Sequence, residues 1–217
     1  MPHHTSSSSS PQVNLVHQAV QYDWLLRCIT FGRGQQLRKR MGDLLPLRVG
    51  NTVLDVGCGT GDLAIEIMKR VGTRGQVVGI DGSEEMIARA RQKAQRRHLP
   101  IEFRVEHAET LSFPDHRFDV VVSSLVFHAL PGSLKLSVLT TIARVLKEGG
   151  HLVIIDFLAS SGHVLTHTAQ PADPHDLPTL LRHGGFQPVQ SGRIPFLTVG
   201  IPPLGFVSAL LPRNARA

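Results

Sequence analysis

One loop in this 217-residue sequence has a composition suited to holding a ligand, the stretch DVGCGTG at residues 55–61. Its glycines fall at alternate positions, which lets the backbone turn tightly and lets a ligand lie against main-chain N–H groups. A dinucleotide-binding loop would have GxGxxG spacing, and its third glycine would stand where this chain has Asp62. Because an aspartate at the start of a helix repels a diphosphate, we expect a ligand that lacks phosphates and carries a cationic or zwitterionic group near the loop.

The second candidate binding residue is Asp81, which ends the next apolar run and precedes Gly82. A carboxylate at the end of that strand can accept paired hydrogen bonds from a ribose diol, as it does in nucleotide-binding sheets. The competing role for Asp81 is to cap the following helix, but Ser83 stands in the better capping position. A ribose, a positive charge and no phosphate together describe S-adenosylmethionine.

The elements that position these residues follow from hydrophobic periodicity. Short apolar runs alternate with longer amphipathic segments, a pattern typical of parallel strands covered by helices on both faces. We expect strands at 52–56, 76–81, 101–105, 118–124, 151–157, 186–192 and 196–200, and helices at 62–72, 83–98, 134–148 and 174–185. The fold class is therefore α/β, a Rossmann-like, doubly wound and mostly parallel seven-stranded sheet with an antiparallel C-terminal hairpin.

Length and composition fit one folded domain, since 217 residues of which 41% are hydrophobic can bury a full core. We expect a disordered tail at 1–12 and an N-terminal helical lid segment at 13–47. The S-adenosylmethionine-binding domain would follow at 48–201, and an apolar C-terminal tail at 202–217. The polar N-terminal run contains no signal-peptide-like apolar stretch. Prolines and glycines interrupt the uncharged run 194–212, which argues against a membrane-spanning helix there.

Charge and cysteine content narrow the class of partner. Lys and Arg exceed Asp and Glu by 23 − 17 = 6, so the chain tolerates an anionic partner or a membrane surface without requiring one. Cys28 and Cys58 are too few for a disulfide framework and lack the CxxC spacing of a zinc or redox site. We expect a cytoplasmic protein without a metal, and the sequence leaves open a peripheral membrane contact and a homodimer.

Four stretches in this order resemble the class I S-adenosylmethionine-dependent methyltransferases: DVGCGTG, IDGSEEMIARA, AETLSFPDHRFDVVVSS and RVLKEGGHLVIIDF. The likeness covers about residues 20–200, and these motifs are highly specific for the superfamily. The upstream stretch that begins YDWLLRC is similar, more loosely, to the ubiquinone/menaquinone-biosynthesis C-methyltransferases and to related phospholipid N-methyltransferases.

The resemblance implies which residues bind S-adenosylmethionine. Asp55 and the glycine loop would line the methionine part, and Asp81 would hold the ribose. Gly82 and Met86 would lie near the adenine, and the end of the strand at 118–124 would border the methyl group. The implied residues are Tyr22, on the lid, and Asp55, Gly57, Cys58, Gly59, Gly61, Asp81, Gly82, Met86, His107, Ala108, Glu109, Ser123 and Ser124.

One position departs from the family pattern. After the third strand the family has an acidic residue followed by alanine, which meets the adenine, and this chain has His107-Ala108. A neutral histidine can accept the same hydrogen bond, and Glu109 is a substitute next to it.

His128, just beyond the strand at 118–124, is the candidate catalytic base. Methyl transfer is an in-line displacement that depends mainly on orientation and exclusion of water. A phenol or carbon-acid acceptor must also lose a proton, which a histidine can take. A packed residue at the start of a loop is the equally supported alternative for His128.

The sequence therefore predicts an S-adenosylmethionine-dependent methyltransferase acting on a small-molecule or lipid-like acceptor: a quinol, a phenol or an amine. One alternative is a nucleic-acid methyltransferase that uses the basic helix around 89–97, although no NPPY-like segment or Pro-Cys dipeptide is present and aromatics are few. The other is a cofactor-binding inactive or regulatory partner subunit.

Overall fold

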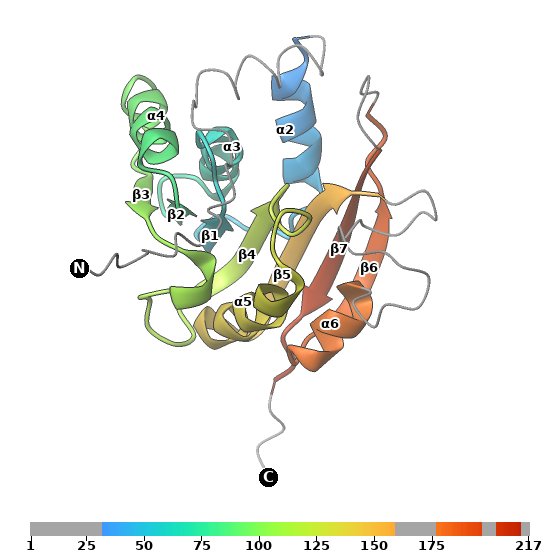
Figure 1. The fold of residues 1–217 in the computed structure, drawn as a ribbon. Coiled ribbons are helices and arrows are strands. Elements are labelled where there is room, and N and C mark those ends of the chain that lie inside the picture. Colours follow the sequence, from blue (N-terminus) through green and yellow to red (C-terminus); the bar gives the residue numbers. More distant parts are fainter. Residues whose placement is uncertain (1–31, 159–176, 197–202, 214–217) are drawn as a thin grey trace, which may run out of the picture.

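The computed structural model describes residues 32–158, 177–196 and 203–213 (Figure 1). The predicted tail 1–12, the first part of the lid segment with Tyr22, and residues 159–176 lie outside them. The helices are α2 (Gly34–Asp43), α3 (Asp62–Val71), α4 (Glu84–Gln95), α5 (Gly132–Val145) and α6 (Leu177–His183), with a short 3-10 helix η1 (Ala108–Thr110). The strands are β1 (Thr52–Val56), β2 (Gln76–Asp81), β3 (Glu102–Val105), β4 (Phe118–Ser124), β5 (Leu146–Phe157), β6 (Gln187–Arg193) and β7 (Leu204–Leu210).

These strands form one seven-stranded sheet in the order β3-β2-β1-β4-β5-β7-β6. Strands β1 to β5 are mutually parallel, whereas β7 runs antiparallel to both β5 and β6. The predicted Rossmann-like sheet with an antiparallel C-terminal hairpin is confirmed. The chain order reverses between β1 and β4, so the connections that follow these two neighbouring strands leave toward opposite faces of the sheet.

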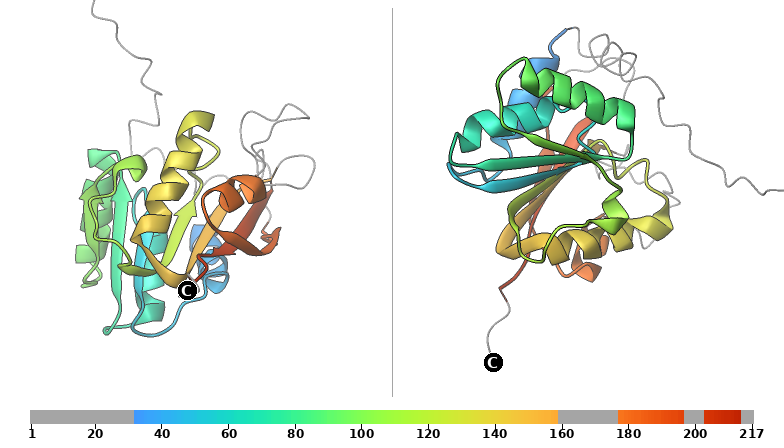
Figure 2. Two further views of the ribbon diagram at one scale, coloured as in Figure 1. Left: turned by 90° about the horizontal axis from the view of Figure 1, so that it is seen from below. Right: turned by 90° about the vertical axis from the view of Figure 1, so that its left-hand side faces the viewer.

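Helices cover both faces, as Figure 2 shows. Side chains alternate along each strand, and the two sets are buried in separate apolar clusters. One cluster joins Val53, Val122 and Ile155 to α2, α3 and α4. The other joins Leu54 and Ile154 to α5 and α6. Burial on both faces explains why these strands are near-continuous apolar runs in the sequence.

The last strand differs from its prediction. It lies at Leu204–Leu210, in the segment predicted as an apolar tail, whereas residues 197–200 of the strand predicted at 196–200 lie outside the described part. Strand β7 is inserted between β5 and β6, which buries Leu204 through Ala209. A continuous apolar run is what a central strand requires, so assigning 202–217 as a tail was wrong for this part.

The boundary between α5 and β5 also differs. The helix ends at Val145 and not at residue 148, because Leu146 already has extended backbone angles and pairs with Phe118 of β4. The register then shifts before Val120 pairs with His151, and Gly149, at φ +75°, lies in this irregular stretch. Strand β5 is consequently five residues longer at its start than the predicted 151–157.

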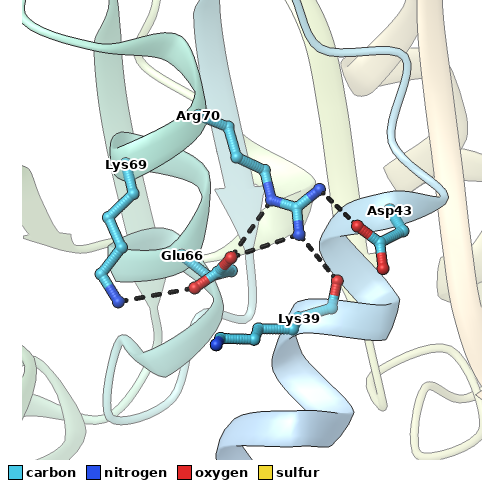
Figure 3. A network of polar contacts seen from close by, with 5 residues as sticks. All are labelled: Lys39, Asp43, Glu66, Lys69 and Arg70. Atoms are coloured by element: carbon cyan, nitrogen blue, oxygen red, sulfur yellow. Dashed lines mark hydrogen bonds and ion pairs between the residues drawn. The ribbon is translucent and has the colours of Figure 1, made fainter.

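Helix α2 is fastened to α3 by one arginine (Figure 3). The Arg70 guanidinium bonds Asp43 at 2.9 Å and the carbonyl of Lys39 at 2.8 Å, both on α2. On its own helix it bonds Glu66 at 3.2 Å, and Lys69 pairs with the other oxygen of that carboxylate at 3.5 Å. This cluster orients α2 over the sheet.

We expect Arg70→Ala to lower the free energy of unfolding by about 1–3 kcal/mol, since it removes several charge-assisted hydrogen bonds at a partly buried position. Arg74→Ala is the matched control, because Arg74 is exposed on the loop after the same helix. Urea unfolding followed by circular dichroism measures both. Equal stability of the two variants would contradict the assigned role of Arg70.

Candidate functional site

The polar residues singled out in the sequence lie near the ends of β1 and β4, where the connections that follow these two strands leave toward opposite faces of the sheet. Parallel strands present their carboxyl ends at one edge of the sheet, and in open α/β sheets ligands bind there, at the point of reversed order. Asp55 on β1, Asp81 on β2 and Ser123 on β4 all lie at or next to these ends. The topology therefore brings together residues that are far apart in the chain.

The glycine loop between β1 and α3 has the backbone that its sequence predicts. Gly57, Gly59 and Gly61 all have positive φ, between 53° and 79°. At Gly61 an added Cβ would lie 2.8 Å from the ring of Phe103, so this glycine allows α3 to begin close to the core. At Gly57 the neighbouring space is occupied by Val126, which an added Cβ would meet at 2.2 Å. Gly57 thus also serves packing of the segment after β4.

Asp81 faces the loop. One carboxylate oxygen accepts the N–H of Gly59 at 2.9 Å, and the other accepts the N–H of Ser83 at 2.9 Å. Burial raises the pKa of Asp81, while these two backbone hydrogen bonds and His107 lower it. A carboxylate has about four acceptor positions, so Asp81 retains capacity for a ligand hydroxyl at each oxygen.

The start of α4 is organised as predicted. Ser83 caps the helix and accepts the N–H of Met86 at 3.3 Å, so Asp81 is not needed as the cap. Met86 is buried. His107 lies beside Gly82, where an added Cβ would be 3.1 Å from the imidazole. His107 is exposed, and it precedes η1, which contains Ala108 and Glu109.

Asp55 is a buried acid without a hydrogen-bond partner for either carboxylate oxygen among the described residues. Burial raises the pKa of Asp55 to about 7, which Asp81 reinforces and which the Arg38 guanidinium and the nearby backbone N–H of Ala64 partly oppose. An unsatisfied buried carboxylate is costly in the absence of a ligand. An ammonium group placed beside it would supply both the missing hydrogen bonds and the opposite charge.

Arg38 was missed at the sequence level. It lies on α2, and its charge lowers the pKa of Asp55, against the effect of burial. The surrounding stretch GRGQQLRKR shows only a run of basic residues, which is ordinarily a solvated helix face. Only the docking of α2 through Arg70 distinguishes Arg38 from its neighbours.

Two loop residues make contacts that the sequence did not predict. Asp62 pairs with Lys93 of α4 at 3.1 Å, and Lys93 also bonds Thr60 at 2.7 Å. The negative charge of Asp62 is thereby offset, so repulsion of a phosphate by Asp62 no longer supports the inference about ligand charge. Cys58 is buried and lies against Gly79, and burial raises the pKa of its thiol well above the ordinary value.

A second polar group lies on the opposite face of the sheet. The Nδ1 atom of His128 lies 2.7 Å from Oδ1 of Asp156, a fully buried residue near the end of β5. Ser123 is buried with no partner for its hydroxyl in the described part, and Ser124 follows it at the strand end. Asp156 was also missed, although a lone acid that closes the apolar run HLVIIDF was a readable signal.

The described residues show no group of three or more His, Cys, Asp or Glu side chains that could hold a metal ion. Within the same ranges no helix has the length and apolar character needed to cross a membrane.

Comparison with known proteins identifies the family. Residues 47–189 match the family described as a methyltransferase domain. The chain belongs to this methyltransferase family. It is 37% identical over 139 residues to a demethylmenaquinone methyltransferase of Thermus thermophilus, covering 64% of this chain and 62% of that protein. It is 32% identical to the enzyme of the same name from Staphylococcus saprophyticus, over 78% of this chain and 67% of that protein.

Solved structures share the fold of this methyltransferase domain. A methyltransferase from Aquifex aeolicus superposes with a TM-score of 0.66 at 24% identity, over 89% of this chain and 98% of that one. The [4+2]-cyclase SpnF superposes with a TM-score of 0.69 at 21% identity, over 82% of each chain. Because the fold also carries a cyclase, it does not by itself decide the reaction.

The titration of Asp55 yields a stability prediction. The folded chain keeps this carboxyl group protonated up to about pH 7, whereas the unfolded chain releases the proton near the ordinary value of 3.8. Unfolding thus releases a proton between these values, so the free energy of unfolding falls as pH rises through them. We expect Asp55→Asn to flatten this slope and to be more stable than wild type at alkaline pH, by at most about 4 kcal/mol.

Urea unfolding at acid and alkaline pH measures the difference, with Asp115→Asn as the control because Asp115 is an exposed aspartate paired only at the surface with Arg144. If the free energy of unfolding changes with pH in the same way for wild type and Asp55→Asn, Asp55 is not held protonated.

Proposed function

We propose that this protein binds S-adenosylmethionine at the carboxyl end of β1 and β2. The single observation that carries the proposal is the unsatisfied, fully buried carboxylate of Asp55 beside a loop with three positive-φ glycines. The amino acid end of the cofactor carries an ammonium and a carboxylate. Asp55 suits the ammonium, and Arg38 supplies a positive charge for the carboxylate.

Asp81 is the proposed ribose ligand, since its oxygens retain acceptor capacity and face the loop. Gly82 and Met86, with His107, Ala108 and Glu109, are the proposed surroundings of the adenine, and Tyr22 is the proposed lid residue. The backbones of Gly57, Cys58, Gly59 and Gly61 form the proposed cradle, with Ser123 and Ser124 beside the reacting group. These assignments rest on the family's pattern and on the positions described above.

When bound, S-adenosylmethionine supplies a methyl group on a positively charged sulfur, which keeps the bonding electrons when the methyl leaves. The chain's own contribution is to orient the acceptor in line with that methyl and to exclude water, effects worth up to about 7–11 kcal/mol in favourable cases. The buried surroundings of Asp55 and Ser123 suit this role.

We propose a quinone-like small molecule in its reduced quinol form as the methyl acceptor. The names of the curated relatives support it. The chain spans 62% and 55% of the length of the Thermus thermophilus and Hydrogenovibrio crunogenus relatives, so the proposal concerns the shared domain. We further propose that the protein works in the cytoplasm and reaches a lipid-like acceptor at a membrane surface.

The nucleic-acid alternative loses part of its support in the structure. Of the basic residues on α4, Arg91 bonds the carbonyl of Phe103 at 2.6 Å and Lys93 bonds Thr60 and Asp62. Two of the charges that would contact phosphates are thus engaged within the fold, Arg91 with β3 and Lys93 with the glycine loop and the start of α3.

We expect Asp81→Asn to weaken binding of S-adenosylhomocysteine about 10- to 100-fold, because hydrogen bonds to a charged group contribute roughly 1.5–3 kcal/mol. Isothermal titration calorimetry measures the affinity, and thermal melting checks the fold. Asp115→Asn again serves as the control and should bind like wild type. No binding by the wild type would overturn the proposed cofactor.

We expect steady methyl transfer from labelled S-adenosylmethionine to a naphthoquinol and none to mixed RNA. Phosphatidylethanolamine vesicles complete the panel and test the amine class of acceptor. Transfer only to RNA or to the amine would overturn the quinol proposal, and cofactor binding without any turnover would favour the inactive partner subunit.

A further inference from the structure

The imidazole of His128 is held in a defined orientation by the end of β5. Besides the contact with Nδ1, Asp156 accepts the backbone N–H of His128 at 2.9 Å and that of Phe157 at 2.9 Å. The ring packs edge-to-face on Phe157, with centroids 4.8 Å apart. Leu125, at φ +60°, turns the chain out of β4, and its N–H bonds the carbonyl of Ile155 at 2.8 Å. The segment that carries His128 is therefore attached to β5 at both ends.

This arrangement determines which ring nitrogen can take a proton. An ionised carboxylate only accepts hydrogen bonds, so Nδ1 carries the hydrogen and Nε2 carries the lone pair of the neutral imidazole. When Nε2 takes a proton, the buried charge of Asp156 at 2.7 Å stabilises the imidazolium. Serine proteases use a carboxylate on Nδ1 in the same two ways.

We infer that Asp156 is a positioning residue for His128, which it orients to take the hydroxyl proton of the acceptor before methylation. The inference rests on the proposed function and deepens it by assigning the base and the residue that orients it. A quinol or phenol becomes strongly nucleophilic only as its anion, whereas a neutral amine already has a lone pair. A carboxylate-oriented histidine next to the end of β4 suits the first class.

In the proposed step, His128 removes the hydroxyl proton of the acceptor. The acceptor O–H bond breaks, and the proton forms an N–H bond at Nε2 of His128. The electron pair stays on the acceptor, shared between its oxygen and the conjugated ring carbon, and this pair forms the new bond to the methyl carbon while the sulfur–methyl bond breaks and its electrons stay on the sulfur. If the ring carbon is the atom methylated, its hydrogen then leaves as a proton and the oxygen regains a proton, which restores the aromatic quinol. The imidazolium then returns its proton to solvent.

Three variants test the inference with a naphthoquinol as acceptor. We expect His128→Ala to lower kcat about 10²- to 10⁴-fold, the usual contribution of a general base, with KM changing little. Asp156→Asn should lower kcat as well, because the amide can donate to Nδ1 and thereby favour the wrong tautomer. The double variant should be no slower than His128→Ala, since Asp156 acts through the imidazole. Asp115→Asn is the matched control and should be unaffected.

The acidity of the acceptor provides a readout that a purely structural role would not change. A cyano-substituted naphthoquinol ionises more readily, so it needs the base less. We expect the loss of kcat caused by His128→Ala to be smaller with this acceptor, and we expect added imidazole to restore part of it. The inference would be overturned if His128→Ala lowered kcat equally for both acceptors, or if the losses of kcat in the two single variants added up in the double variant.

The cofactor-free protein gives an independent test by nitrogen–proton NMR, in which His128→Ala identifies the signal among the 12 histidines. We expect the Nδ1–H tautomer in wild type and the Nε2–H tautomer in Asp156→Asn. The Nε2–H tautomer in wild type would overturn the inference. If Asp156→Asn does not fold, the tautomer of the wild type still tests the role of Asp156, and the acceptor comparison with His128→Ala tests the base, because that variant keeps the backbone bonds to Asp156.

Calorimetry separates this inference from the proposed function. If S-adenosylhomocysteine does not bind, the proposed function fails. If it binds and quinol is methylated at the same rate by wild type, His128→Ala and Asp156→Asn, the function stands and the inference alone is wrong.

Discussion

The site depends on one topological constraint, the divergence of the chain connections after β1 and β4. These strands are neighbours and parallel, yet the helix after β1 covers one face and the helix after β4 covers the other. The loops that follow them are therefore drawn apart at the carboxyl edge, where the carboxyl ends of the five parallel strands lie side by side. Each strand can place a polar side chain there without interrupting the apolar faces below.

The two faces carry different chemistry. Asp55 and Asp81 lie toward the layer of α2, α3 and α4, and the charge of Arg38 on α2 acts on Asp55. Ser123 and Asp156 lie toward the layer of α5 and α6, as the alternation of side chains along β4 and β5 requires, and Asp156 holds the ring of His128. A cofactor bound between Asp55 and Asp81 and an acceptor deprotonated by His128 would thus approach each other across the ends of β1 and β4.

Stability and binding are in tension at Asp55. Its buried, unpartnered carboxylate destabilises the ionised fold, and the helix that carries Arg38 is fastened by Arg70. A ligand ammonium would relieve that cost, so part of the binding energy would come from removing an unfavourable interaction. This is a reason for a protein to retain an acid where an apolar residue would be more stable.

The sequence alone determined the sheet, the positions of β1, β2 and β4, the glycine turn and the cap at Ser83, because these follow from periodicity and local backbone chemistry over a few residues. It did not determine β7, whose apolar run LGFVSAL becomes a central strand only through pairing with β5 and β6. Nor did it single out Arg38 among the basic residues of α2 or join Asp156 to His128, 28 residues away. Such pairs are decided by which strand ends and helices meet in space, and no local pattern encodes that meeting.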